Sequence, residues 1–133
     1  MKIAIVRLSA LGDIVHSMVI LQFIKKNCPD VVIDWVIEKR FQGILANNPH
    51  INQIHQVSLS STKESKSLFL FWNELRKIRK LGKYDLVIDM QGLIKSALVA
   101  RMIPSDITLG FDKESLRERL AVIFYIMEVR LGF

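Results

Sequence analysis

The stretch Ile3-Ala4-Ile5-Val6, followed by Ser9-Ala10-Leu11-Gly12-Asp13, decides the fold of this chain. The first four residues are apolar, as in a strand that is buried on both faces. A helix-like segment follows over residues 13–27. A strand, a glycine turn and an acid at the start of a helix form a place where a ligand is usually held. We expect Gly12 to let the backbone turn tightly between the two elements.

Asp13 has two possible roles in this arrangement. Its carboxylate can cap the helix by accepting the free N–H groups of the first turn. It can also point into a cleft and accept a proton from a substrate. The position of Asp13 at the start of the helix favours the capping role. The sequence leaves both the capping role and the proton-accepting role open at this point.

Working outward, strands and helices alternate along the whole chain. Strand-like runs cover residues 2–6, 31–37, 53–57, 85–89 and 107–109, and helix-like runs cover residues 13–27, 39–46, 66–81, 93–102 and 113–125. This alternation predicts an α/β fold with a doubly wound parallel sheet and right-handed crossovers. Residues 1–125 form one domain in this interpretation, and residues 126–133 are expected to be an irregular tail. The two tryptophans, Trp35 and Trp72, are expected in the core.

Composition limits the class of protein. The chain has 133 residues, of which 50% are hydrophobic and 24% are charged, so it can bury a core as one domain. No apolar run approaches the ~20 residues that span a bilayer, and the start of the chain lacks the features of a signal peptide. Cys28 is the single cysteine, which argues against a disulfide framework. These features predict a cytoplasmic protein.

Positive charge is concentrated in one segment. The net charge is +6, and residues 63–83 hold seven basic residues, including Lys63 and Lys66, against two acidic ones. Such a patch suits an anionic partner, namely phosphates, acidic lipid headgroups or nucleic acid. The plainer alternative is a solvated helix face.

A second loop resembles the first. After the strand at residues 85–89 come Gln91 and Gly92, and Lys95 and Ser96 lie in the first turn of the next helix. If the strands at 2–6 and 85–89 are neighbours, both loops line one crevice at the carboxyl ends of the strands. Two helix N-termini would then face an anionic ligand. Alternatively, Asp89 and Gln91 only satisfy the backbone of the turn.

Other candidates are weaker. Gly110-Phe111-Asp112 precedes Arg117 and Arg119, and an arginine there could clamp a phosphate or a carboxylate, although a surface ion pair is the commoner explanation. His16 lies three residues after Asp13 and could share its helix face, or be structural. The chain has no glycine-rich nucleotide motif and no recognised metal-ligand spacing, so no metal or cofactor is expected.

Three segments together resemble a known family. They are Ser9-x-x-Gly12-Asp13, the strand Asp34-Trp35-Val36-Ile37-Glu38, and the stretch at residues 84–97. In this order and spacing they are similar to the bacterial lipopolysaccharide heptosyltransferases of glycosyltransferase family 9, over residues 1–125. The resemblance implies a GT-B enzyme with two Rossmann-like domains. This chain would correspond to the N-terminal, acceptor-side domain, with the C-terminal donor domain absent.

The resemblance also implies an activity. It implies transfer of L-glycero-D-manno-heptose from ADP-heptose to the Kdo of Kdo–lipid A during lipopolysaccharide inner-core biosynthesis. The reaction would be inverting and metal-independent, with Asp13 as the catalytic base. The patch with Lys63 and Lys66 would meet the acceptor at the cytoplasmic face of the inner membrane, and no nucleic acid would be bound. The residues expected to bind substrate are Ser9, Gly12, Gln91, Gly92, Lys95, Ser96, Lys63 and Lys66.

Two alternatives accompany this interpretation. A second or third heptosyltransferase of the same family would share the fold and the first loop. A non-enzymatic basic α/β module could bind nucleic acid through residues 63–83. The aromatic residues are not interleaved with the basic ones as stacking on bases requires, which ranks the second alternative low.

Overall fold

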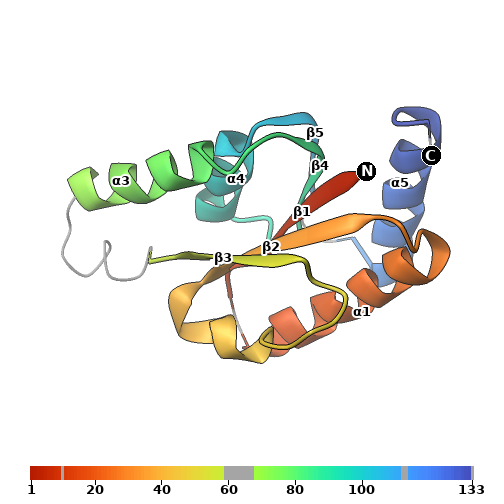
Figure 1. Ribbon diagram of the computed structural model, residues 1–133, viewed down its shortest axis with the longest axis horizontal. Helices are drawn as coiled ribbons and strands as arrows, with labels where there is room; N and C mark the ends of the chain where they lie inside the picture. The colour runs from red at the N-terminus through yellow and green to blue at the C-terminus, as the bar shows by residue number, and fades with distance from the viewer. Residues whose placement is uncertain (10, 59–67, 112–113, 133) are drawn as a thin grey trace.

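Five parallel strands form the centre of the molecule in the computed structural model, which describes residues 1–9, 11–58, 68–111 and 114–132 (Figure 1). The strands are β1 (Lys2–Val6), β2 (Val32–Glu38), β3 (Gln53–Val57), β4 (Tyr84–Asp89) and β5 (Ser105–Gly110). Their order in the sheet is β3-β2-β1-β4-β5, and every neighbouring pair is parallel. The predicted α/β fold with a doubly wound parallel sheet is therefore confirmed.

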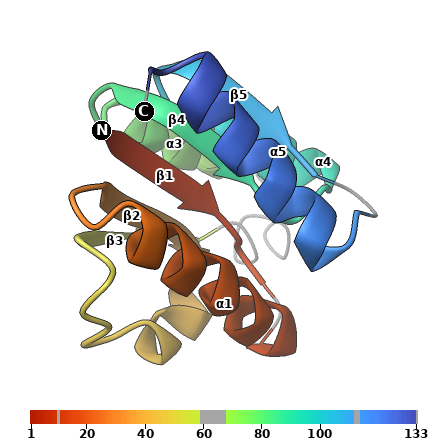
Figure 2. The same cartoon turned by 90° about the vertical axis from the view of Figure 1, so that its right-hand side faces the viewer.

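Helices cover both faces of this sheet. They are α1 (Leu11–Asn27), the 3-10 helix η1 (Lys39–Ile44), α3 (Leu68–Arg79), α4 (Ile94–Met102) and α5 (Leu116–Val129). Helices α1 and α5 lie on one face, and α3 and α4 lie on the other (Figure 2). Within the described ranges, none of the helices is both long enough and apolar enough to cross a membrane.

Alternate residues of each central strand serve two separate cores. In β1, Ile3 and Ile5 pack with α1 and α5, whereas Ala4 and Val6 pack with α3 and α4. All four are fully buried. Strands that are covered on both faces need apolar residues at every position, which explains the continuous apolar run that opens the chain.

The order of the strands in the sheet reverses at the boundary between β1 and β4. From β1 the chain moves outward through β2 to β3, and it then returns to add β4 and β5 on the other side of β1. Val6 at the end of β1 aligns with Asp89 at the end of β4. The loops after these two strands therefore start side by side, at the switch point where doubly wound sheets hold their ligands.

The structure corrects three expectations from the sequence. The segment expected as a helix at 39–46 is the 3-10 helix η1, which ends at Ile44. Helix α5 continues to Val129 instead of ending at residue 125, because Met127 is buried in the core and Ile126 packs against it. Trp35 is fully buried as expected, but Trp72 is 57% exposed.

A buried polar cluster ties the strands together near their amino ends. The Tyr84 hydroxyl donates to Asp34 Oδ2 at 2.6 Å, reaching across β1, where the small residue Ala4 aligns with Asp34. Asp34 Oδ1 accepts from Asn52 Nδ2, and His55 Nε2 lies 3.6 Å from Oδ2. Burial and the Asp34 carboxylate raise the pKa of Tyr84 well above its ordinary value. The cluster satisfies a fully buried carboxylate and lies at the other end of the sheet from the switch point.

Candidate functional site

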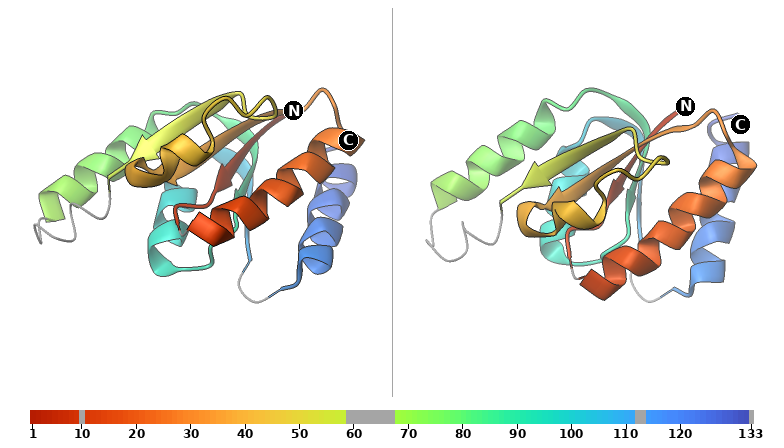
Figure 3. Two further views of the ribbon diagram at one scale, coloured as in Figure 1. Left: turned by 90° about the horizontal axis from the view of Figure 1, so that it is seen from below. Right: turned by 60° about the horizontal axis from the view of Figure 1, so that its bottom comes forward.

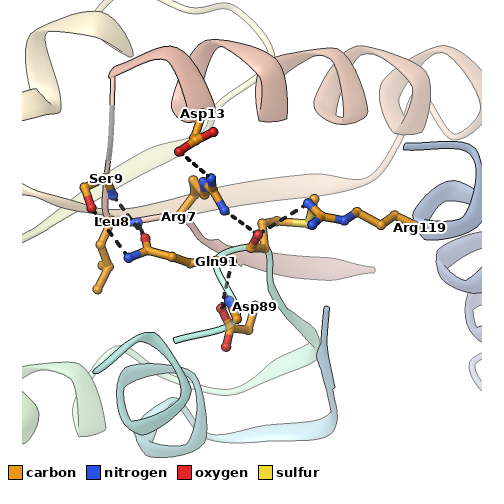
Figure 4. A network of polar contacts seen from close by, with 9 residues as sticks. Arg7, Leu8, Ser9, Asp13, Asp89, Gln91 and Arg119 are labelled. Atoms are coloured by element: carbon orange, nitrogen blue, oxygen red, sulfur yellow. Dashed lines mark hydrogen bonds and ion pairs between the residues drawn. The ribbon is translucent and has the colours of Figure 1, made fainter. Parts of the chain in front are cut away.

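Gln91 joins the two loops at the switch point (Figure 4). We name residues 7–10, after β1, the first loop, and residues 90–93, after β4, the second loop. Gln91 Oε1 accepts hydrogen bonds from the backbone N–H groups of Leu8, at 2.8 Å, and Ser9, at 3.1 Å. The Gln91 Nε2 and Ser9 Oγ atoms are 3.5 Å apart. The expectation that the two loops meet is confirmed, and the Gln91 side chain is the link between them.

Hydrogen bonds to Asp89 and Ser96 fix the conformation of the second loop. Asp89 Oδ1 accepts from the backbone N–H groups of Gln91, at 3.0 Å, and Gly92, at 3.3 Å. Asp89 Oδ2 accepts from the Ser96 hydroxyl at 3.2 Å. Ser96 is fully buried, and its hydroxyl also bonds both backbone groups of Leu93. The Ser96 hydroxyl is therefore used inside the protein in this structure, and its expected contact with substrate stays a prediction.

The two loop glycines have different reasons to be glycine. Gly92 has a φ of 73°, in the left-handed region that strains any residue with a side chain. Gly12 lies inside α1 without a left-handed φ, and a Cβ atom placed on it would meet no atom within 4 Å. The expectation that Gly12 makes a tight turn is wrong. What Gly12 provides is open space one residue before Asp13.

Asp13 forms an ion pair with Arg7, a residue that the sequence analysis missed. Arg7 Nη2 lies 3.1 Å from Asp13 Oδ2. Asp13 is the third residue of α1, so it lies in the first turn, where a negative charge is favourable. The Asp13 side chain is 62% exposed, whereas that of Arg7 is 11% exposed. The carboxylate thus faces outward while a buried cation holds one of its oxygens. The signal in the sequence is an arginine directly after a buried strand.

Arg7 is fixed by the surrounding backbone. Trp35 Nε1 donates to the Arg7 carbonyl at 3.1 Å, so the buried indole anchors the first loop. Arg7 Nη1 donates to the Met90 carbonyl, and Arg119 Nη1 from α5 reaches the same oxygen at 3.4 Å. Two guanidinium groups from distant parts of the sequence therefore converge on the start of the second loop (Figure 4).

The electrostatics of Arg7 reflect this crowding. Burial lowers the pKa of Arg7 most strongly, and the like charge of Arg119 lowers it further. The Asp13 carboxylate opposes both effects. A cation held at such a place retains its charge because its ordinary pKa is very high. An anion bound nearby would be favoured by both guanidinium groups.

A pocket of about 230 Å³ brings these groups together. Its lining residues come from the first loop, from α1, and from α5 and the residues just before it. They are Arg7, Asp13, His16, Ser17, Ile20, Glu114, Leu116 and Arg119. His16 and Asp13 therefore share a face, as the sequence allowed. An exposed carboxylate beside two guanidinium groups can accept a proton from a hydroxyl while the cations hold an anionic group.

A second hollow lies beside the second loop. It has a volume of about 370 Å³ and includes Gly92, Leu93, Ile94 and Phe111. Glu114 contributes to this hollow and to the pocket around Asp13, so the two hollows are neighbours. Gly92 is therefore placed where a ligand could approach its backbone.

The remaining predicted residues fall elsewhere. Lys95 is partly exposed in the first turn of α4 and does not line either hollow. Arg117 is exposed on α5 and does not line the pocket around Asp13, whereas Arg119 does. Lys63, Lys66 and Asp112 lie outside the described residues.

Comparison with known proteins identifies the family. The model of glycosyltransferase family 9 (heptosyltransferase) matches residues 72–132. Lipopolysaccharide heptosyltransferase 1 from Campylobacter coli is 44% identical over 133 residues, which are 100% of this chain and 37% of that protein. The E. coli heptosyltransferase WaaC with ADP is similar in structure, with a TM-score of 0.73 and 32% identity over 94% of this chain and 40% of the other.

The same E. coli enzyme with ADP-2-deoxy-2-fluoro heptose gives a TM-score of 0.75 at 32% identity, over 94% of this chain and 41% of the other. The chain thus spans well under half the length of these relatives. The sequence match over the full chain and the shared fold agree with the resemblance in the loops. The chain belongs to glycosyltransferase family 9, the heptosyltransferases.

Proposed function

We propose that this chain is part of an enzyme that transfers heptose from ADP-heptose to the Kdo of Kdo–lipid A in lipopolysaccharide inner-core biosynthesis. The relative at 44% identity is named heptosyltransferase 1, which supports the first heptose transfer over the second or third. A similar structure with an ADP-linked fluoro-heptose supports a nucleotide-sugar donor. The observation that carries the proposal is the exposed Asp13 carboxylate held by Arg7 at the switch point of the sheet.

In this mechanism Asp13 is the general base. Its carboxylate accepts the proton of the acceptor hydroxyl while that oxygen forms a bond to the anomeric carbon of heptose. The bond from this carbon to the diphosphate breaks on the opposite side, and ADP leaves with the electron pair. The configuration at the anomeric carbon is therefore inverted.

Arg7 contributes to this step through its ion pair with Asp13. By binding Oδ2, it fixes the direction of the carboxylate, so that the other oxygen can face the acceptor hydroxyl. Fixed positive charge at the pocket also suits an anionic group of the acceptor or the diphosphate of the donor. In the proposed enzyme this chain forms the acceptor side of the cleft, and a second domain binds most of the donor.

We also propose that the enzyme works at the cytoplasmic face of the inner membrane, where a lipid-linked acceptor is held. Lys63 and Lys66 suit the charged inner core of the acceptor, and the basic residues at 68–83 suit an anionic leaflet. Lys63, Lys66 and Lys95 remain predicted contacts in this proposal.

The test is a transfer assay with the full-length protein that contains this chain. ADP release should require Kdo–lipid A that lacks heptose, and it should be lost with an acceptor that already carries the first heptose. The reverse preference would identify a later step of the pathway. Asp13→Asn should abolish most turnover while ADP-heptose binding persists. Asp30→Asn, at an exposed acid in the turn before β2, is the matched control and should leave turnover unchanged.

A further inference from the structure

The outer face of α3 combines exposed aromatic residues with cations. Phe69 is 71% exposed and Trp72 is 57% exposed, and Leu70 beside them is exposed as well. Arg76 and Arg79 follow at steps of four and three residues, so they continue the same side of the helix. The core contacts of α3 come from other residues, among them Leu75 and Ile78. We name Phe69, Trp72, Arg76 and Arg79 the α3 face.

The charge of this region is strongly one-sided. Residues 68–83 contain five basic residues and one acidic residue. Lys77 pairs with Glu74 at 3.3 Å, and Lys83 pairs with Asp106 at 2.9 Å. Within the described part of the chain, no ion pair forms at Arg76, Arg79 or Lys80. The positive charge of the α3 face is therefore not neutralised by the described residues.

The position of α3 leaves this face accessible. The first turns of α3 extend past the carboxyl end of β3, in Figure 1 and in both views of Figure 3. Because β1 and β3 run in the same direction in the sheet, this is the end at which the first loop and Asp13 lie. The aromatic part of the α3 face is its amino-terminal part, so it lies toward the edge that carries the candidate site.

We propose that the α3 face docks on the surface of an anionic lipid bilayer, with Phe69 and Trp72 among the headgroups and Arg76 and Arg79 on lipid phosphates. Tryptophan favours the membrane interface because its ring is apolar and its N–H stays hydrated. Exposed cations beside it gain from the negative surface potential. The α3 face is thereby the surface through which the proposed enzyme associates with the membrane. This inference rests on the membrane association in the proposed function.

The composition of the face favours lipid over nucleic acid. Aromatic residues and arginines are also common at protein interfaces, and the melting-temperature test below separates a covering protein domain from lipid. A single-stranded nucleic acid would need a basic groove with aromatic residues along it, and the aromatic residues of α3 lie together at one end of a projecting helix. Leu70 adds an exposed apolar side chain that cannot form a hydrogen bond to a base.

Vesicle flotation of the full-length protein tests the proposal. Vesicles of phosphatidylethanolamine with phosphatidylglycerol should bind the protein, and vesicles of phosphatidylcholine alone should bind it far less. Arg76→Gln/Arg79→Gln should lower partitioning roughly twenty-five-fold, at about fivefold for each basic residue. Phe69→Ser/Trp72→Ser should lower it roughly tenfold through lost apolar burial. Brominated lipids should quench the fluorescence of Trp72, measured as the difference between the wild type and Trp72→Phe.

Matched controls come from the opposite face of the sheet. Phe23→Ser and Lys26→Gln change one exposed aromatic residue and one exposed cation on α1, and they should leave partitioning unchanged. Equal losses in the α1 and α3 variants, or no loss in the α3 variants, would overturn the proposal. So would a large fall in the melting temperature of Phe69→Ser/Trp72→Ser without vesicles, because the face would then be covered by the rest of the protein. Salt-sensitive binding to RNA or DNA through the same residues, with no vesicle binding, would also overturn it.

Flotation without any sugar donor separates this proposal from the transferase activity. Heptose transfer to a deacylated, water-soluble acceptor should be the same in the wild type and the α3 variants. If the wild type transfers no heptose but its vesicle binding depends on α3, the proposed reaction fails and the docking surface stands. If transfer to the soluble acceptor is normal and vesicle binding does not depend on α3, the docking surface fails alone.

Discussion

The first and second loops begin side by side and look alike in sequence, but they use their polar side chains in opposite ways. Each follows a buried strand and leads into a helix, with Gly92 in the second loop and Gly12 in the first turn of α1. In and next to the second loop, the side chains of Asp89 at the end of β4, Gln91 in the loop and Ser96 in α4 bond to the protein itself. In the first loop and the turn after it, Arg7 and Asp13 form a charged pair that lines a pocket.

This difference distinguishes residues that stabilise the fold from residues that can contact a substrate. A carboxylate that accepts hydrogen bonds from two backbone N–H groups and from the Ser96 hydroxyl, as Asp89 does, has little capacity left for a ligand. An exposed carboxylate that contacts a single guanidinium group remains accessible to a substrate. The comparison predicts that changes at Asp13 impair turnover and that changes at Asp89 and Gly92 impair stability.

The largest expected effect is on turnover at Asp13. In the full-length enzyme, Asp13→Ala should lower kcat by about 10²–10⁴-fold, the usual contribution of a general base. Its free energy of unfolding should change by no more than about 1 kcal/mol, because the pair with Arg7 is partly exposed. Steady-state kinetics and thermal melting measure the two quantities. A stable variant with normal kcat would remove Asp13 from the mechanism.

The next largest effect is on stability at Asp89. Asp89→Ala removes the acceptor for three donors and should destabilise the fold by roughly 3 kcal/mol. Urea unfolding measures this loss. Asp106→Ala, at an exposed acid whose partner is Lys83, is the control and should cost at most about 1 kcal/mol. Similar small losses in both variants would contradict the supporting role of Asp89.

A smaller effect is expected at Gly92. An alanine at this left-handed φ of 73° should destabilise the protein by about 1–2 kcal/mol. Thermal melting of Gly92→Ala tests this value. A neutral result would mean that the second loop relaxes to another conformation.

The smallest effect on stability is expected at Gly12, the matching glycine after the first loop. Gly12→Ala should be neutral or should stabilise the protein by up to about 1 kcal/mol, because the residue is helical and its Cβ meets open space. A raised KM at unchanged stability would indicate that a substrate uses that space. A loss of stability comparable to that of Gly92→Ala would remove the distinction between the two glycines.

Much of the fold could be predicted because its signals are local. Apolar runs gave β1 and β3 with their observed bounds, and strand–helix alternation gave the parallel sheet. The meeting of the two loops followed from the general rule that parallel strands end at the same edge. The predicted end of α5 was wrong because Met127 packs against the core and stays helical. No signal in the neighbouring sequence indicates that packing.

The sequence by itself determined the α/β class, the two glycine loops and the family, because apolar periodicity and short motifs are properties of neighbouring residues. The tertiary structure decided which polar side chains are used internally and which are exposed. Arg7 meets Arg119 only when α5 packs onto the sheet, and Gln91 meets Leu8 only when β4 joins β1. Trp72 is exposed because α3 buries a different side of its surface. These outcomes depend on residues that are distant in the chain, so they appear only once the sheet is assembled.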